Sequence, residues 1–154
     1  MDTLVPDANV LIAFYKVDWF DSIAFWRPEY DIEIPQAVWD DEFAATREVS
    51  RPEWIELVEV ESAQGEDRSN LSVYDWKCLE HAEQHDGILI TRDKPLKEMA
   101  ENLDVDVMWS AKFLMTTFEG CGIKENDYRN NLDPYLEDAY LPPVVHQELH
   151  DAEK

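Results

Sequence analysis

Residues Thr3–Phe14 read TLVPDANVLIAF, a short apolar run that reaches an acidic residue, Asp7, and then continues as an apolar helix. This is the pattern of a parallel β-strand that leads into a crossover helix. Residues Gly87–Leu96, GILITRDKPL, repeat it: an apolar run precedes Asp93, and Pro95 stands where a helix can begin. Two predicted strands are therefore each followed by an aspartate.

The rest of the chain alternates predicted strands and helices. Further strands are predicted at 31–34, 54–60 and 105–108, and helices at 9–14, 19–26, 37–48, 72–85, 95–102 and 110–118, with a polar loop at 63–70. This alternation predicts the α/β class: a three-layer α/β/α sandwich with a five-stranded parallel sheet in the order 3-2-1-4-5. Residues 1–120 are expected to form this domain. Residues 121–154 are expected to be an acidic tail, partly helical, that packs on the domain or extends from it.

The composition is strongly acidic. The chain of 154 residues carries 35 Asp and Glu against 13 Lys and Arg, a formal charge of −22, and the acids are spread along its whole length. Scattered acid indicates a solvating coat, which would repel nucleic acid at low salt because non-specific binding needs Lys and Arg to neutralise phosphates. A coat of this kind suggests a salt-loving organism.

The start of the chain and its cysteines bear on its compartment. The first residues, MDTLVPDANV, lack the basic segment of a signal peptide, and no apolar run reaches membrane-spanning length, so a cytoplasmic protein is expected. Cys78 and Cys121 are far apart in sequence and suit neither a disulfide framework nor a zinc site. Both are expected to be reduced.

Four acids are predicted to converge at one edge of the sheet. In the order 3-2-1-4-5 the chain reverses direction between strands one and four, and ligands bind at that switch point. Asp7 and Asp93 follow those two strands. Asp75 lies in the first turn of the helix that leads into strand four, which places it at the same edge. Glu42 lies about two turns into the helix after strand two, with a longer side chain to reach upward.

Each of these acids also has an ordinary structural interpretation. Asp7 and Asp93 can be helix N-caps, Asp75 can complete a capping box with Ser72, and Glu42 can be a solvated helix acid. Independent caps, however, have no reason to meet at one switch point. Like charges there would repel unless a cation sits between them, and an oxygen-only cluster selects a hard ion, Mg²⁺ or Mn²⁺.

Two other patterns in the sequence allow both a functional and a structural interpretation. His81 and His85 are four residues apart on a predicted helix and could grip a metal, but a solvated helix face is expected, since the glutamate of HExxH is missing. Several aromatic residues could stack nucleic-acid bases, yet their helical spacing favours the core; they are Trp19, Trp26, Trp39, Phe43, Trp76 and Trp109.

The chain resembles the PIN (PilT N-terminus) nuclease domain, in particular the VapC-type toxins, over roughly Thr3–Met108. The resemblance rests on the motifs DANVLI, IPQAVWDDEF, LSVYDWKCLEHA and LITRD. The resemblance implies a catalytic, metal-binding quartet with two polar supports, namely Asp7, Glu42, Asp75 and Asp93 with Asn9 and Thr91. The chain departs from the family at Ala8, where Ser or Thr is common, and in its longer tail after Phe118.

What the resemblance implies is Mg²⁺- or Mn²⁺-dependent hydrolysis of RNA phosphodiester bonds by the toxin of a toxin–antitoxin pair, with a cognate antitoxin as possible partner and a homodimer as expected assembly. Arg92, Lys94 and Lys97 flank Asp93 and could hold substrate phosphates, or could be ordinary surface bases. The alternative from another class is a non-catalytic acidic binding module, a nucleic-acid mimic or partner-binding protein, without a metal site.

Overall fold

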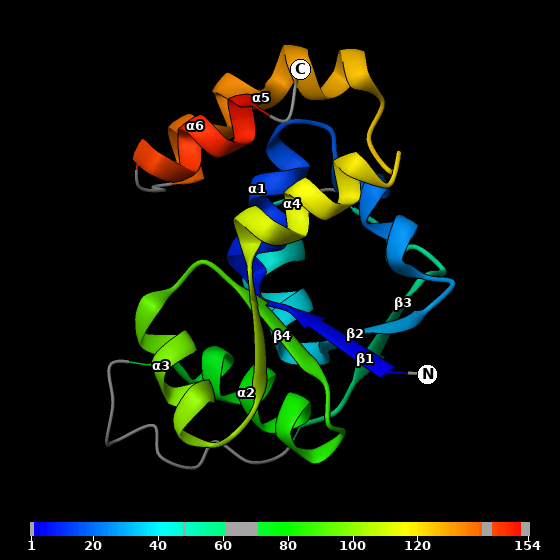
Figure 1. Cartoon of the computed structure of the whole chain (residues 1–154). Coiled ribbons are helices and arrows are strands. Elements are labelled where there is room, and N and C mark those ends of the chain that lie inside the picture. The colour runs from blue at the N-terminus through cyan, green and yellow to red at the C-terminus, as the bar shows by residue number, and fades with distance from the viewer. Residues whose placement is uncertain (1, 48, 61–70, 140–142, 152–154) are drawn as a thin grey trace.

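Five parallel strands form the centre of the fold (Figure 1). The computed structural model describes residues 2–47, 49–60, 71–139 and 143–151. The strand order β3-β2-β1-β4-β5 confirms the predicted α/β sandwich, and all pairs are parallel. The strands are β1 (Asp2–Pro6), β2 (Tyr30–Pro35), β3 (Ile55–Val58), β4 (Ile88–Thr91) and β5 (Asp106–Trp109). The order reverses between β1 and β4, so the switch point lies where it was predicted.

The central strands are apolar on both faces. In β1, every residue from Thr3 to Pro6 is buried, and in β4 the residues from Leu89 to Thr91 are buried. A strand covered by helices on both sides needs this continuous apolar run, whereas a half-exposed strand alternates. The same burial leaves the strand ends as the place where polar residues can gather.

Helices cover both faces of the sheet (Figure 1). One face is covered by α2 (Val73–Gln84) and α3 (Lys94–Asn102), and the other by α1 (Ala8–Lys16), the 3₁₀ helix η1 (Phe20–Trp26) and α4 (Ser110–Glu119). Beyond α1 and α4 lie α5 (Glu125–Ala139) and α6 (Pro143–Asp151), which form an outer layer. These elements account for the predicted helices, and the predicted loop 63–70 lies outside the described residues.

The segment after β2 differs from the regular helix predicted for 37–48. It forms a π-helix, η2 (Val38–Phe43), and then a 3₁₀ turn, η3 (Ala44–Thr46); the predicted end at Glu48 lies outside the described residues. The wider turn brings Trp39 and Phe43 into a parallel stack, with ring centroids 4.9 Å apart. π-Helical turns are rare and occur frequently at functional sites.

The C-terminal helices are joined to the domain by a buried aromatic stack. Tyr128 of α5 stacks on Trp19 and on Phe118, with centroid distances of 5.9 and 3.8 Å, and its hydroxyl donates to the carbonyl of Leu149 in α6 at 2.6 Å. Tyr135 is also buried. The described part of the tail therefore packs on the domain, while Tyr140 lies outside the described residues.

The aromatic residues predicted to be in the core are buried, with one exception. Trp19, Trp26, Trp39, Phe43 and Trp76 are buried, which confirms their assignment. The prediction for Trp109 is wrong: its side chain is 39% exposed, because Trp109 is the last residue of β5, an edge strand of the sheet.

The prediction of a solvated face for the two histidines is wrong for one of them. His81 is only 4% exposed, and its Nε2 lies 2.6 Å from Glu33 Oε1 of β2, because α2 packs against that strand. His85, four residues later, is exposed, as predicted.

In the described part of the chain, no helix combines the length and apolar character needed to cross a membrane.

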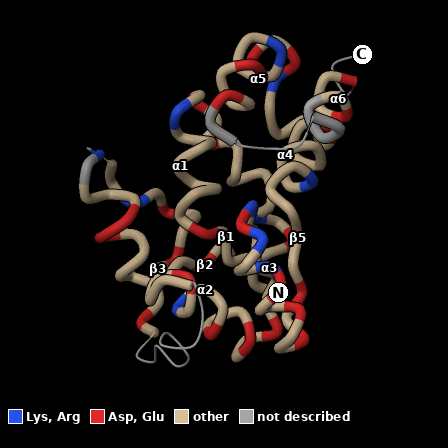
Figure 2. The backbone as a smooth tube through the Cα atoms, turned by 90° about the vertical axis from the view of Figure 1, so that its left-hand side faces the viewer, with Lys and Arg blue, Asp and Glu red and all other residues tan. Residues whose placement is uncertain are grey.

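The acidic residues are distributed over many of the described elements rather than gathered in one segment, as Figure 2 shows along the backbone. We expect the melting temperature to rise by about 5 °C between low salt and molar KCl, because screening relieves the self-repulsion of a charge of −22. Thermal unfolding followed by Trp fluorescence measures it. A sorbitol series of equal osmolality is the control, and a melting temperature that is flat in KCl would contradict the prediction.

Candidate functional site

Asp7 lies buried at the carboxyl end of β1, with 3% of its surface exposed. It is the N-cap of α1: Oδ1 accepts from the backbone N–H of Val10 at 3.0 Å, and Oδ2 accepts from the hydroxyl of Thr91 at 2.5 Å. Burial raises the pKa of Asp7 to about 6; the charge of Asp75 also raises it, whereas the two hydrogen bonds and Arg92 lower it. The N-cap interpretation is confirmed, and the same carboxylate sits in an acidic environment.

Thr91 connects Asp7 to Asp93. Its hydroxyl donates to Asp7 and accepts from the backbone N–H of Asp93 at 3.0 Å. Asp93 occupies the N-cap position of α3, but its side chain makes no capping hydrogen bond, so that interpretation is wrong for this acid. Burial raises the pKa of Asp93, and so does the charge of Asp75. The carboxylate of Asp93 is therefore left available for another role.

Asp75 is the common neighbour of the other three acids. It completes a capping box with Ser72, with hydrogen bonds of 3.1 and 3.3 Å, as its structural interpretation predicted. Burial raises its pKa. Its charge in turn raises the pKa of Asp7, of Glu42 and of Asp93. The acids from β1, η2 and β4 thus meet around the first turn of α2.

Glu42 is half-buried on η2, so the interpretation as a solvated helix acid is wrong. The pKa of Glu42 is raised to about 7, chiefly by burial and then by the charges of Asp75, Asp7 and Asp41, in that order of importance. The neighbouring residue Asp41 is exposed on the same π-helix. Its carboxylate accepts from the hydroxyl of Tyr74 at 2.9 Å.

Cys78 lies beneath these acids and was not predicted to be part of the site. It is a buried free thiol, and Cys121 is free as well, as expected. Burial raises the pKa of Cys78 well above its usual range, and the charges of Asp7, Asp75 and Glu42 add to the effect. Its position three residues after Asp75, hence on the same helix face, was the available signal.

The predicted supports and bases occupy different environments. Thr91 is buried and bonded to Asp7, whereas Asn9 is exposed on the first turn of α1. Arg92 is close enough to lower the pKa of both Asp7 and Tyr135, which places it between the acids and α5.

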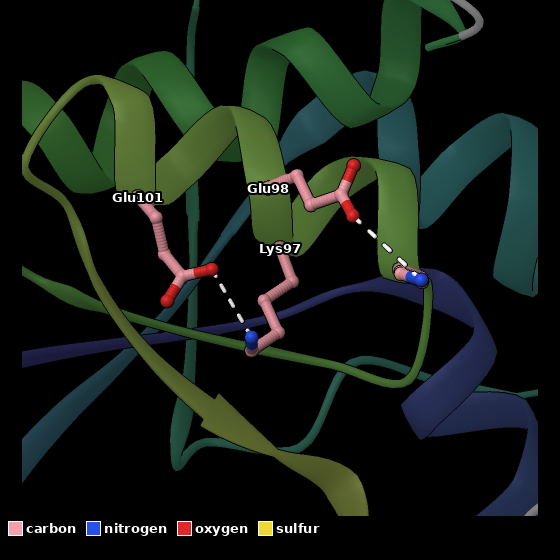
Figure 3. Close-up of polar contacts among 4 residues, drawn as sticks. Lys97, Glu98 and Glu101 are labelled. Carbon is pink, nitrogen blue, oxygen red and sulfur yellow. Dashed lines mark hydrogen bonds and ion pairs between the residues drawn. The ribbon is translucent and has the colours of Figure 1, made fainter.

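Two further bases on α3 pair with glutamates of the same helix. Lys94 Nζ lies 3.9 Å from Glu98 and Lys97 Nζ lies 3.1 Å from Glu101, and Figure 3 shows both pairs along the helix. Their positive charge is therefore partly neutralised. A role in phosphate binding stays a prediction for Lys94 and Lys97, as it does for Arg92.

The donor set of the cluster suits a hard cation in kind. It offers four carboxylates, and the charge of Asp75 raises the pKa of the other three, an effect that a bound divalent ion would reverse. Yet among the described residues no three His, Cys, Asp or Glu side chains stand close enough together to ligate one ion. The four carboxylates are therefore the right ligand type for a hard cation, and binding one ion would require their side chains to move closer together.

A surface pocket of about 760 Å³ lies elsewhere, lined among others by Tyr15, Phe20 and Arg47. None of the four carboxylates lines it. We place the candidate site at the carboxylates, because burial raises the pKa of all four there, and the charge of Asp75 raises the pKa of the other three.

Comparison of the chain with protein-family models, with curated proteins and with solved structures found no match in any of the three.

Proposed function

We propose that this protein is a divalent-metal-dependent ribonuclease that hydrolyses RNA phosphodiester bonds. One observation carries the proposal: Asp7, Glu42 and Asp93 come from three separate elements at the switch point of the sheet, and each has its pKa raised by the charge of Asp75. Structural caps alone give no reason for such a concentration of like charge. The motif resemblance to PIN nucleases supports the same conclusion.

Asp7, Glu42, Asp75 and Asp93 would hold Mg²⁺ or Mn²⁺. An ion held there supplies positive charge against the phosphate and lowers the pKa of a water molecule. The protein's own contribution is orientation. Thr91 fixes one oxygen of Asp7 and the backbone of Asp93 together, and the capping box fixes the first turn of α2. Three of the four carboxylates are thus attached to rigid strand ends or helix starts.

Arg92 is the base that we propose to contact a substrate phosphate, since it is near enough to Asp7 to lower the pKa of that carboxyl. We extend the proposal to the toxin of a toxin–antitoxin pair that forms a homodimer. An arginine from a cognate antitoxin would suit the acidic site through bidentate pairing. Metal and antitoxin should then compete for the carboxylates.

The test begins with Mn²⁺ binding. We expect Mn²⁺ at millimolar concentration to raise the melting temperature by about 5 °C, because an ion that binds only the folded state stabilises it. Thermal unfolding with and without EDTA measures this, and the same preparation should cleave single-stranded RNA in Mn²⁺ but not in EDTA. Ca²⁺-free KCl of equal ionic strength is the control for screening of the acidic coat.

A non-catalytic acidic binding module is the second candidate, and the spacing of the acids favours it, since no three of the described side chains form a ready ligand set. It predicts no stabilisation by Mn²⁺ beyond that of the ionic-strength control, and no cleavage. Stabilisation by Mn²⁺ beyond the ionic-strength control, or metal-dependent cleavage of RNA, would exclude the binding module.

A further inference from the structure

Trp109 is a large apolar side chain at the functional edge of the sheet. Four large apolar side chains in the described residues are exposed, namely Tyr15, Phe25, Leu103 and Trp109. Tyr15, Phe25 and Leu103 lie toward the amino edge of the sheet. Each stands at or just after the C-terminal end of a helix, α1, η1 or α3, that leads back to this edge. Trp109 ends β5 and so lies at the carboxyl edge, on the side of the molecule where the acids gather.

Trp109 is close to the carboxylates by two routes. It pairs in register with Thr91 on the neighbouring strand, at a spacing of roughly 4.8 Å, and Thr91 bonds to both Asp7 and the backbone of Asp93. On α3, Lys97 lies one turn after Asp93, and its Nζ is 5.2 Å from the centroid of the Trp109 ring. The indole is therefore on the order of 10 Å from the acids.

The environment of the ring is nearly neutral. Lys97 contacts the ring and also pairs with Glu101 at 3.1 Å, and Lys94 pairs with Glu98 (Figure 3). A nucleic acid that approaches a protein of charge −22 gains little from such paired lysines. An aromatic face contributes binding energy that does not depend on net charge, because every base has a π-face to stack on it.

We propose that Trp109 is a stacking platform for an unpaired base of an RNA substrate whose scissile phosphate lies at Asp7, Asp75 and Asp93. This inference rests on the proposed ribonuclease function and names its substrate class. Paired bases in an RNA helix are stacked on each other and cannot place a face on the indole, whereas bases in single strands and loops can. The substrate is thus single-stranded or looped RNA.

The experiment uses a fluorescently labelled single-stranded 2′-O-methyl oligoribonucleotide, which resists cleavage, and anisotropy in Mg²⁺. We expect Trp109→Ala to raise the Kd at least about tenfold, and Trp109→Phe to raise it less than about threefold. The matched control is Tyr15→Ala, which removes a similarly exposed aromatic ring that also has a cation over it, Arg47 at 5.7 Å, at the opposite edge. It should bind as the wild type does.

Two altered probes separate stacking from a general structural effect. An abasic oligomer should bind the wild type as weakly as the normal oligomer binds Trp109→Ala, and the duplex form should bind about tenfold more weakly than the single strand. The inference is overturned if Trp109→Ala binds normally, if the wild type binds no oligomer, or if the variant loses equal affinity for the abasic probe. A change in oligomeric state without a change in affinity would also overturn it, since Trp109 would then be an interface between copies.

Failure of this inference can be told apart from failure of the proposed function. Cleavage of unmodified RNA by the wild type, with Trp109→Ala equally active and equally tight in binding, would leave the ribonuclease intact and remove the platform. Binding that depends on Trp109, without any metal-dependent cleavage, would leave the platform and remove the ribonuclease.

Discussion

Asp7→Asn is expected to reduce metal-dependent RNA cleavage by at least about 100-fold. The proposed metal site loses a negatively charged ligand, and metal-assisted catalysis lowers the activation free energy by several kcal/mol. The fold should survive the change. Asn is as good an N-cap as Asp, so the hydrogen bond from Val10 can be kept. Initial rates of cleavage of a labelled single-stranded RNA in Mn²⁺ measure the effect.

The same substitution should leave stability at pH 8 equal to or above that of the wild type. The substitution loses the acceptor for the Thr91 hydroxyl, which costs about 1 kcal/mol of stability. It also removes the buried carboxylate of Asp7, whose pKa is raised to about 6, and this gains about 3 kcal/mol at pH 8. Asp106→Asn, an exposed acid at the amino end of β5, is the control of equal charge change. Normal cleavage by Asp7→Asn would refute the catalytic role, and a variant that unfolds would leave Asp7 a structural cap only.

The central strands could be predicted because a strand that is buried on both faces has a continuous apolar sequence. The runs that end before Asp7 and Asp93 are continuous and apolar, and the second of them forms β4, Ile88–Thr91. The topology followed from the alternation of strands and helices, since parallel strands need crossover helices. Sheet order then fixed which aspartates would share an edge.

The arrangement within the site was less predictable, because it depends on local geometry. The register of Glu42 and Asp41 follows from the π-helical turn, and nothing in VWDDEF distinguishes that turn from an α-helix. Sequence reasoning paired Asp7 with Asp93 directly, whereas Asp75 turned out to be the neighbour that both share. A side chain's neighbours depend on rotamers that a wheel does not give.

The pairing of the two lysines on α3 with glutamates, by contrast, could have been predicted from the sequence. Lys94 and Glu98 are four residues apart, as are Lys97 and Glu101, and such pairs meet on a helix surface. Position in the sheet also explains Trp109. A residue at the end of an edge strand has a neighbouring strand on one side only, so helical spacing was the wrong guide to its burial.

The metal-free protein is expected to be more stable at pH 5 than at pH 8, by about 2 to 4 kcal/mol. The pKa of Asp7 is raised from its ordinary 3.8 to about 6, and that of Glu42 from 4.5 to about 7. Between the ordinary and the raised values the folded state binds more protons than the unfolded state, so the free energy of unfolding falls as the pH rises through that window. Asp7 contributes about 1.4 kcal/mol of this change, and the contribution of Glu42 is reduced because solvent screens its half-buried charge.

Urea unfolding at pH 5 and at pH 8 in 1 M KCl and EDTA measures this difference, since the salt screens the general acidic coat but not a buried carboxylate. Glu42→Gln should gain about 1 kcal/mol at pH 8 and almost nothing at pH 5. Glu83→Gln, an exposed glutamate on α2, is the matched control and should change neither value. Saturating Mn²⁺ should reverse the order of the two pH values, because the ion requires ionised carboxylates. If stability were instead the same at both pH values in EDTA, the four acids would not share a confined site, and the metal-binding role would lose its physical basis.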